Sequence, residues 1–298
     1  MKIQTGYMPF REYRTYYRIV GDLDSEKTPL LLLHGGPGST HNYFEVFDQL
    51  AEETGRPVVM YDQIGCGKSS IPDDKSLWNA DTWVAELKTL RDYLGLKQVH
   101  LLGQSWGGML AIIYMCDHNP QGVKSLILAS TLSSSKLWAQ EQHRMIKFMS
   151  PEDQVAIAKA ESTANYTSSG YLKANEHFML QHASGPITEQ SPEFLRRQKI
   201  SGEVAYVTAW GPNEYFPTGN LKDYDYTDKL KNIITPTLVT SGTDDLCTPL
   251  VAKTMVDQLP NVEWTLFAHS RHMAFIDETE AYMKRLIKWL AKMIENNF

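Results

Sequence analysis

The sequence predicts an α/β protein whose central sheet is mostly parallel and covered by helices on both faces. Short apolar runs recur along the chain, and most of them end at glycine, proline or polar residues. Stretches with the periodicity of amphipathic helices lie between these runs. Strands that alternate with helices in this way build parallel sheets, because the helix carries the chain back to the start of the next strand.

The apolar runs have the length of strands that are buried on both faces. The first covers residues 29–34 and ends at the sequence Gly-Gly-Pro-Gly. The later runs are residues 57–62, 99–102, 125–129, 237–240 and 262–267. Residues 13–20 also resemble a strand but are not followed by a helix, so we expect them in an antiparallel hairpin at the edge of the sheet.

The helical stretches divide the chain into a core and an insertion. They are residues 82–93, 107–117, 250–258 and 280–294. The alternation of strands and helices stops between residues 131 and 230, a segment that we expect to form several helices. The predicted organisation is a core of residues 1–130 and 231–298, with residues 131–230 as a helical cap over the crevice where such sheets bind ligands.

The composition is that of an ordinary soluble globular protein. Of the 298 residues, 42% are hydrophobic and 21% are charged, and the formal net charge is −6 without any acidic run. This balance disfavours nucleic acid and anionic membranes as partners. No apolar run is as long as a membrane-spanning helix and the first residues lack a secretory signal, so we expect a cytoplasmic protein. Cys66, Cys116 and Cys247 form no C-x-x-C pair and are expected to be free thiols.

A nucleophilic serine is indicated at position 105. Residues 103–107 read G-Q-S-W-G, which matches the pattern G-x-S-x-G, between a predicted strand and a predicted helix. This context matters because a nucleophilic serine sits on a tight strand-to-helix turn that exposes its hydroxyl, with glycines that permit close packing. The helix N-terminus behind Ser105 also favours negative charge that develops near it.

Candidate partners for Ser105 follow two later strands. A serine hydroxyl needs a base to take its proton and an acid to orient that base, and in this kind of sheet the chain order is serine, acid, histidine. Asp244 and Asp245 both follow the predicted strand 237–240, and His269 and His272 both follow the last predicted strand. Position along the chain does not choose within either pair.

The glycine-rich loop at residues 34–38 completes the predicted chemistry. Such a loop can donate one backbone N–H to the oxyanion that forms when a serine attacks a carbonyl, and Trp106, which follows the nucleophile, would donate the second. The sequence has no H-E-x-x-H motif, no Cys/His set and no G-x-G-x-x-G motif after a strand. We therefore expect no metal ion and no nucleotide cofactor.

Three motifs together resemble the proline iminopeptidases, which are prolyl aminopeptidases of the α/β-hydrolase superfamily. They are H-G-G-P-G at residues 34–38, D-Q-I-G-C-G at residues 62–67 and G-Q-S-W-G-G at residues 103–108. The similarity covers essentially the whole chain, and the chain looks most like the enzymes of lactic acid bacteria and the tricorn-associated aminopeptidases. It implies an α/β-hydrolase fold with a helical cap and a serine peptidase that needs no cofactor.

The resemblance chooses between the residues that position left open. The family pattern G-x-x-D-x-x-x-P falls on Gly242, Asp245 and Pro249, which implies Asp245 as the acid that orients the base. The family's histidine matches His272. The second glycine of H-G-G-P-G is Gly36, which matches the family's backbone donor to the oxyanion.

The resemblance also implies a residue that binds the substrate's N-terminus. Residues 211–215, G-P-N-E-Y, resemble a family segment whose glutamate binds the free α-amino group, and the match falls on Glu214. A partly desolvated carboxylate is a natural counter-charge for a cationic N-terminus. In some relatives a second glutamate follows the catalytic aspartate, whereas this chain has Leu246 there. The candidates for a further acid are Asp244, Glu176 and Glu203.

These residues predict an enzyme that releases an N-terminal residue, preferentially proline, from short peptides with a free N-terminus. An apolar pocket would hold the proline ring, with Trp138, Trp210 and Tyr215 as candidates for its lining. One rival hypothesis is an esterase or amino-acid amidase of the same fold. The other is a ligand-binding protein with an inactive hydrolase fold, which the apparently complete catalytic set disfavours. The sequence does not indicate an oligomeric state.

Overall fold

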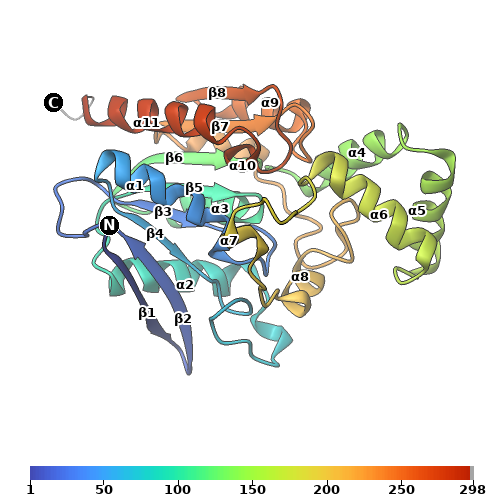
Figure 1. Ribbon diagram of the computed structural model, residues 1–298, viewed down its shortest axis with the longest axis horizontal. Coiled ribbons are helices and arrows are strands. Elements are labelled where there is room, and N and C mark those ends of the chain that lie inside the picture. The colour runs from blue at the N-terminus through green and yellow to red at the C-terminus, as the bar shows by residue number, and fades with distance from the viewer. Residues whose placement is uncertain (296–298) are drawn as a thin grey trace.

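A twisted, mostly parallel sheet forms the centre of the molecule, which is known from a computed structural model that describes residues 1–295 (Figure 1). The strand order is β1-β2-β4-β3-β5-β6-β7-β8. β1 pairs with β2, and β2 with β4, in antiparallel register, whereas the pairs from β4 to β8 are parallel. The strands are Ile3–Phe10 (β1), Tyr13–Val20 (β2), Leu30–Leu33 (β3), Val58–Tyr61 (β4), Val99–Gln104 (β5), Val123–Ala129 (β6), Thr237–Gly242 (β7) and Val262–Phe267 (β8).

Helices follow most of the strands. The α-helices are Asp48–Thr54 (α1), Ala80–Tyr93 (α2), Trp106–His118 (α3), Ser135–Ile146 (α4), Pro151–Thr163 (α5), Ser169–His182 (α6), Glu193–Arg196 (α7), Glu203–Ala209 (α8), Pro249–Gln258 (α9), Ala274–Asp277 (α10) and Thr279–Glu295 (α11). Short 3₁₀ helices cover His41–Phe47, Lys75–Leu77 and Thr227–Asn232. Side chains cap the starts of α2, α4, α5, α6 and α9. At the start of α5, Ser150 accepts a hydrogen bond from the N–H of Asp153 and Pro151 occupies the first turn, which is a common helix start.

The sheet separates two hydrophobic layers, as the alternation of side chains along a strand requires. In β3, Leu31 and Leu33 face the layer formed with α2, α3 and α9, whereas Leu30 and Leu32 face the layer formed with α1 and α11. All four leucines are fully buried. This explains why the parallel strands are continuous apolar runs rather than alternating ones.

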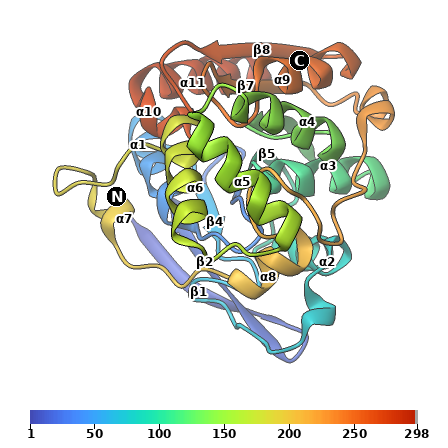
Figure 2. The same cartoon turned by 90° about the vertical axis from the view of Figure 1, so that its right-hand side faces the viewer.

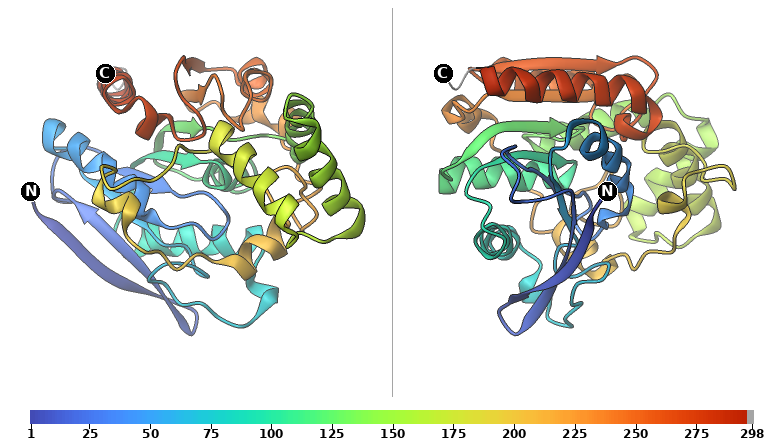
Figure 3. Two further views of the ribbon diagram at one scale, coloured as in Figure 1. Left: turned by 45° about the vertical axis from the view of Figure 1, so that its right-hand side comes forward. Right: turned by 60° about the vertical axis from the view of Figure 1, so that its left-hand side comes forward.

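The predicted strands and the long predicted helices of the core are confirmed within a few residues at their ends. The expected edge hairpin is also confirmed: β1 and β2 pair along their whole length, and β1 is one edge of the sheet. Figure 3 shows this dark blue hairpin at the end of the sheet opposite β8 and α11. The short helices α1 and α10 were not predicted, because segments of seven and four residues carry little periodicity.

The chain between β6 and β7 leaves the core and returns to it at one place. It contains α4 to α8, and Figure 2 shows α4, α5 and α6 across the front of the molecule, beside the ends of the sheet strands. The N–H of Ser135 donates to the carbonyl of Tyr224 (2.9 Å), and the N–H of Tyr226 donates to the carbonyl of Ser133 (2.7 Å). We call this paired segment, residues 133–135 with 224–226, the neck.

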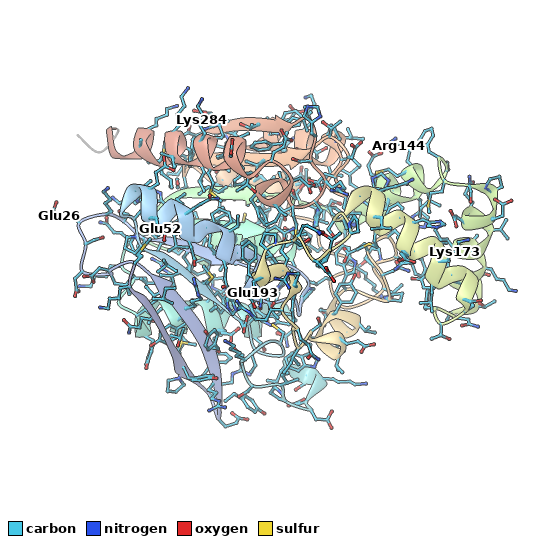
Figure 4. All side chains as sticks on the ribbon, in the orientation of Figure 1. Glu26, Glu52, Arg144, Lys173, Glu193 and Lys284 are labelled. Carbon is cyan, nitrogen blue, oxygen red and sulfur yellow. The ribbon has the colours of Figure 1, made fainter. Side chains whose placement is uncertain are left out.

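The surface of these helices is polar with scattered apolar side chains. Arg144 of α4 and Lys173 of α6 are exposed and lie on this part of the molecule (Figure 4). Within residues 1–295, no helix has the length and apolar character that crossing a membrane requires.

Candidate active site

Ser105 lies on a strained turn between β5 and α3. Its backbone angles are φ 54° and ψ −123°, a conformation that a residue with a side chain rarely adopts. The turn is tight because its glycines leave no room for a Cβ. One at Gly103 would collide with the carbonyl of Gly107, and one at Gly107 would collide with the carbonyl of Leu33. The glycines of the sequence motif therefore permit the turn that presents Ser105 at the start of the helix.

His272 and Asp245 form a buried hydrogen-bonded pair. Nδ1 of His272 lies 2.7 Å from Oδ1 of Asp245, whose carboxylate is 1% exposed. The carboxylate also accepts hydrogen bonds from the N–H of Cys247 (2.8 Å) and the N–H of Gly242 (3.1 Å). These bonds compensate the burial of its charge. With Nδ1–H donated to Asp245, Nε2 of His272 is the nitrogen that can accept a proton.

The alternative acid and base lie elsewhere. The side chain of Asp244 is exposed, and its backbone carbonyl accepts a hydrogen bond from Nδ1 of His182 (2.9 Å). His269 is also exposed, and its N–H donates to Glu278 (2.8 Å). The structure thus places Asp245, and not Asp244, against His272.

A chain of buried hydrogen bonds joins the loop of His272 to the glycine-rich loop. Nε2 of Gln104 donates to the carbonyl of His272 (3.3 Å), and Oε1 of Gln104 accepts from the hydroxyl of Tyr43 (2.9 Å). The same hydroxyl accepts the N–H of Gly35 (2.7 Å). From the end of α6, the carbonyl of His182 accepts the N–H of His272 (3.1 Å). The position of the imidazole is therefore fixed from the core and from α6.

Gly36 and Trp106 lie beside Ser105, where both line a narrow pocket. Gly36 has φ +114°, and a Cβ there would lie 2.6 Å from the nitrogen of Gly38. Only glycine adopts this conformation without strain. Trp106 is the first residue of α3, and the first N–H groups of a helix have no acceptor within the helix. Both backbone donors that the sequence indicated are thus gathered around Ser105.

Gln63 joins the two chain segments that carry these donors, a role that the sequence did not reveal. Its Nε2 donates to the carbonyl of His34 (3.0 Å), and its Oε1 accepts from the indole N–H of Trp106 (2.8 Å). Its backbone N–H donates to Nε2 of His34 (3.0 Å). Burial lowers the pKa of His34 to about 4, so that ring stays neutral and keeps Nε2 as an acceptor. The only signal for this role was the position of Gln63 in the D-Q-I-G-C-G motif.

A cavity of about 520 Å³ lies between the core and the helices α6 and α8. From the core, Gly36, Ser105 and His272 line it. From the segment between β6 and β7, Tyr206 and Glu214 line it. Since concave, largely apolar cavities with a few polar groups are the usual ligand sites of proteins, this is the candidate binding site.

Glu214 brings a carboxylate to this cavity. The hydroxyl of Tyr206 donates to its Oε1 (2.7 Å), and the indole N–H of Trp138 donates to its backbone carbonyl (2.7 Å). Loss of water around the carboxylate raises its pKa, and the hydrogen bond from Tyr206 and the nearby His272 partly oppose this rise. A cation in the cavity would therefore stabilise the ionised form of Glu214.

The candidates for a further acid differ in position. Glu203, at the start of α8, lines the cavity. Glu176 and Asp244 have exposed side chains and are not among the residues that line it. Leu246 does line the cavity and is buried, so the position where some relatives carry a glutamate is apolar in this chain.

Two of the three aromatic candidates line the narrow pocket beside Ser105. These are Trp138 and Trp210, whose rings meet edge to face with their centres 6.3 Å apart. Tyr215 is fully buried instead, and its ring packs against Phe178 with 5.2 Å between the ring centres. Within the part of the chain that the structure describes, no group of three or more His, Cys, Asp or Glu side chains is placed to hold a metal ion.

Comparison with known proteins agrees with this fold and site. The α/β hydrolase fold family matches residues 28–279, which is most of the chain. Together with the strand order and the serine turn, this match defines the chain as an α/β hydrolase.

Individual proteins that are similar to this chain identify its family within the α/β hydrolases. The chain is 72% identical to the proline iminopeptidase of Levilactobacillus brevis, over 98% of this chain and 97% of that protein. It is 72% identical to the proline iminopeptidase of Lactiplantibacillus plantarum, over 95% of this chain and 99% of that protein. The crystal structure of the proline iminopeptidase of Mycobacterium smegmatis superposes with a TM-score of 0.85 at 29% identity, over 97% of this chain and 98% of that one. The chain belongs to the proline iminopeptidase family, as the motifs indicated.

Proposed function

We propose that the protein is a serine aminopeptidase that releases N-terminal proline from short peptides with a free N-terminus. The observation that carries this proposal is that Ser105, His272 and the carboxylate of Glu214 line one cavity. A peptide whose N-terminal ammonium pairs with Glu214 presents its first peptide bond to Ser105. The names of the proline iminopeptidases to which the chain is similar support the same activity.

In the proposed reaction Ser105 is the nucleophile, His272 the base and Asp245 the acid that orients the base. Nε2 of His272 takes the proton of the hydroxyl while Oγ attacks the first peptide carbonyl. His272 then gives this proton to the nitrogen of the leaving amine, and the peptide bond breaks to leave a prolyl ester on Ser105. Water attacks the ester, again with His272 as base, and releases proline. Asp245 holds the imidazole by its 2.7 Å hydrogen bond and stabilises its charged form.

The backbone N–H groups of Gly36 and Trp106 would stabilise the oxyanion of both tetrahedral intermediates. Donors that are fixed before the reaction begins need no reorganisation as negative charge develops. The bonds of Gln63 to His34 and Trp106 support this role, because they hold the two donor segments at a constant separation.

Selection of proline would depend on the aromatic end of the cavity. Trp138 and Trp210 line the narrow pocket beside Ser105, and Glu214 lines it too. A compact apolar ring that packed against these indole rings would keep its secondary ammonium group close to the carboxylate. We also propose that residues 131–230 act as a cap, because this segment supplies Trp138, Trp210 and Glu214.

The test is a comparison of four substrates. They are proline p-nitroanilide, leucine p-nitroanilide, N-acetyl-proline p-nitroanilide and p-nitrophenyl acetate. We expect rapid release only from proline p-nitroanilide among the anilides, because acetylation removes the ammonium that pairs with Glu214. Hydrolysis of the acetate ester alone would make the protein an esterase and refute the peptidase proposal.

The control is Ser105→Ala, which keeps the fold but removes the nucleophile. We expect it to lose activity on every substrate by about 10⁴-fold or more. Labelling of the unmodified protein, but not of Ser105→Ala, by a fluorophosphonate probe would locate the nucleophile directly. Labelling of both would contradict the assignment.

A further inference from the structure

Lys199 places an unpaired positive charge on the wall of the same cavity. It lies between α7 and α8, is half-buried, and lines the cavity with Ser105 and Glu214. Its ammonium group has no hydrogen bond or ion pair with any other group of residues 1–295. Burial lowers the pKa of this ammonium. A half-buried cation without a partner is costly, so a counter-charge from a ligand would stabilise it.

The segment that carries Lys199 is held on the core at two residues that follow it, Ile200 and Gly202. The carbonyl of Ile200 accepts the N–H of Gly67 (2.7 Å), and the N–H of Gly202 donates to the carbonyl of Gly38 (2.7 Å). A Cβ at Gly202 would collide with the carbonyl of Gly65. The backbone next to Lys199 is thus packed against the two loops that surround the nucleophile, which keeps the ammonium at the cavity.

The charged residues near Lys199 do not neutralise it. They either form ion pairs with other residues or lie more than 4.0 Å from its ammonium group. Arg197 forms ion pairs with Glu45 and Glu193, and Figure 4 shows Glu193 on α7. Glu203 lines the cavity but is exposed and forms no ion pair of 4.0 Å or less with Lys199 within the described chain. Lys199 is therefore available to an anionic group that enters the cavity.

Charge is distributed unequally along the cavity. Glu214 lines both the main cavity and the narrow aromatic pocket beside Ser105, whereas Lys199 lines the main cavity but not that pocket. A short peptide with free ends has the same asymmetry, with an ammonium at one end and a carboxylate at the other. When its ammonium is at Glu214 and its first peptide bond at Ser105, the rest of the peptide extends into the part of the cavity that Lys199 lines.

We propose that Lys199 binds the C-terminal carboxylate of a short peptide substrate and so selects for peptide length. This inference rests on the proposed aminopeptidase function. The two charged ends of the substrate would be bound by Glu214 and Lys199, with the scissile bond between them. A peptide amide, or a peptide too long to place its carboxylate in the cavity, loses the second interaction.

The experiment compares peptide substrates that differ only in their C-terminal group. Prolyl-glycine, prolyl-glycyl-glycine and their C-terminal amides are assayed beside proline p-nitroanilide, which has no carboxylate. The variants are Lys199→Met, Lys199→Arg and, as a matched loss of one positive charge on an exposed site, Lys222→Met. Proline p-nitroanilide also reports whether each variant is folded.

We expect Lys199→Met to lower kcat/KM for the better of the two free-acid peptides by about 10-fold or more, mainly through KM, as loss of a charge-assisted hydrogen bond predicts. In Lys199→Met, kcat/KM for the amides and the anilide should change by less than about 2-fold. Lys199→Arg should retain most of the preference for the free acid. Lys222→Met should resemble the unmodified protein. Equal losses on acid and amide, or no loss on either acid, would overturn the inference while the aminopeptidase function stands. Failure of the unmodified protein to hydrolyse proline p-nitroanilide would refute the proposed function itself.

Discussion

The cavity has two walls that are built differently. We call the residues outside 131–230 that line it, together with the buried hydrogen-bonded residues behind them, the core wall, and the residues within 131–230 that line it the cap wall. On the core wall, buried hydrogen bonds connect Gln63, Trp106 and His34 in one set, and Gly35, Tyr43, Gln104 and His272 in another. On the cap wall, the Glu214 carboxylate has one hydrogen bond, from Tyr206, and Lys199 has none within residues 1–295. The groups that we propose to react are held in place, whereas the charged groups that we propose to bind the substrate can still accept or donate further hydrogen bonds.

This difference separates the two tasks of the enzyme. A preorganised wall stabilises the transition state of any acyl group that reaches Ser105, and its loss lowers kcat for all substrates. A wall with unsatisfied charges contributes only when a substrate supplies the opposite charge. Variants of the core wall should therefore affect all substrates alike, and variants of the cap wall should distinguish between them.

The largest effect is expected at the core wall from Asp245→Asn. The amide cannot hold the imidazole in the required tautomer, so kcat should fall by about 10⁴-fold on proline p-nitroanilide and also strongly on p-nitrophenyl acetate. Steady-state kinetics on both substrates measure this. A loss confined to substrates with a free amine would mean that Asp245 acts in substrate binding instead.

The next effect is expected at the cap wall from Glu214→Gln. Loss of the counter-charge should lower kcat/KM for proline p-nitroanilide by about 100-fold, while p-nitrophenyl acetate changes by about 3-fold or less. Similar losses on both substrates would contradict an amine-binding role.

The pH dependence sharpens the same comparison. The pKa of Glu214 is raised. As the pH falls, its carboxylate is therefore protonated earlier than that of an ordinary glutamate. In the unmodified protein kcat/KM for the free amine should therefore decline more steeply on the acid side than kcat/KM for the ester, because only the amine requires the ionised carboxylate of Glu214. In Glu214→Gln the amine and the ester should show the same dependence of kcat/KM on pH on the acid side. A difference that persisted in this variant would show that Glu214 does not cause it.

A smaller effect is expected from Gln63→Leu, which has no group that bonds both His34 and Trp106. The separation of the two backbone donors would be less well fixed, so kcat should fall by about 10-fold with little change in KM. The ratio of anilide to ester activity should stay constant, and Gln63→Glu, which retains the acceptor for Trp106, should recover part of kcat. A change in KM for the free amine alone would place Gln63 with the cap wall.

The smallest effect on activity, with a measurable effect on stability, is expected from Glu86→Gln. Glu86 lies under the loop of Gln63, where its carboxyl accepts the N–H of Ile64 (2.8 Å) and the hydroxyl of Thr15, and burial raises its pKa to about 8. Between its ordinary pKa and this raised value the folded protein binds the extra proton, so its stability falls as pH rises through that window.

The glutamine variant lacks this proton and should lack this slope. Its Tm relative to the unmodified protein should therefore be higher by a few degrees at about pH 9 than at about pH 5. Thermal unfolding at the two pH values measures this difference. Parallel Tm curves for the two proteins would show that Glu86 does not carry the proton.

The parts of the fold and site that the sequence predicted are those with a strong local signal. The buried runs 29–34 and 237–240 became β3 and β7, and the turn at Ser105 followed from the glycines around it. The choice of Asp245 over Asp244 needed the family resemblance, since both residues follow the same strand. The structure separates them by burial and by the hydrogen bond of Asp245 to His272.

The parts that the sequence did not predict depend on long-range packing. Gln63 touches His34 and Trp106, which are far from it along the chain, so no periodicity or spacing reveals its role. Lys199 is an ordinary lysine in a polar segment, and only the cavity distinguishes it. Tyr215 was a candidate for the pocket from composition alone, but its ring packs against Phe178.

The neck has a consequence for how this fold can change. Since the chain leaves the core at residues 133–135 and returns beside them at residues 224–226, the insertion is joined to the core as one closed loop. The entropy of closing a loop grows only with the logarithm of its length, so even a doubling costs about 0.6 kcal/mol. The parts of the insertion that make no contact with the core can therefore be lengthened or shortened with little cost to the sheet. An unchanged nucleophile can in this way be offered to very different acyl groups.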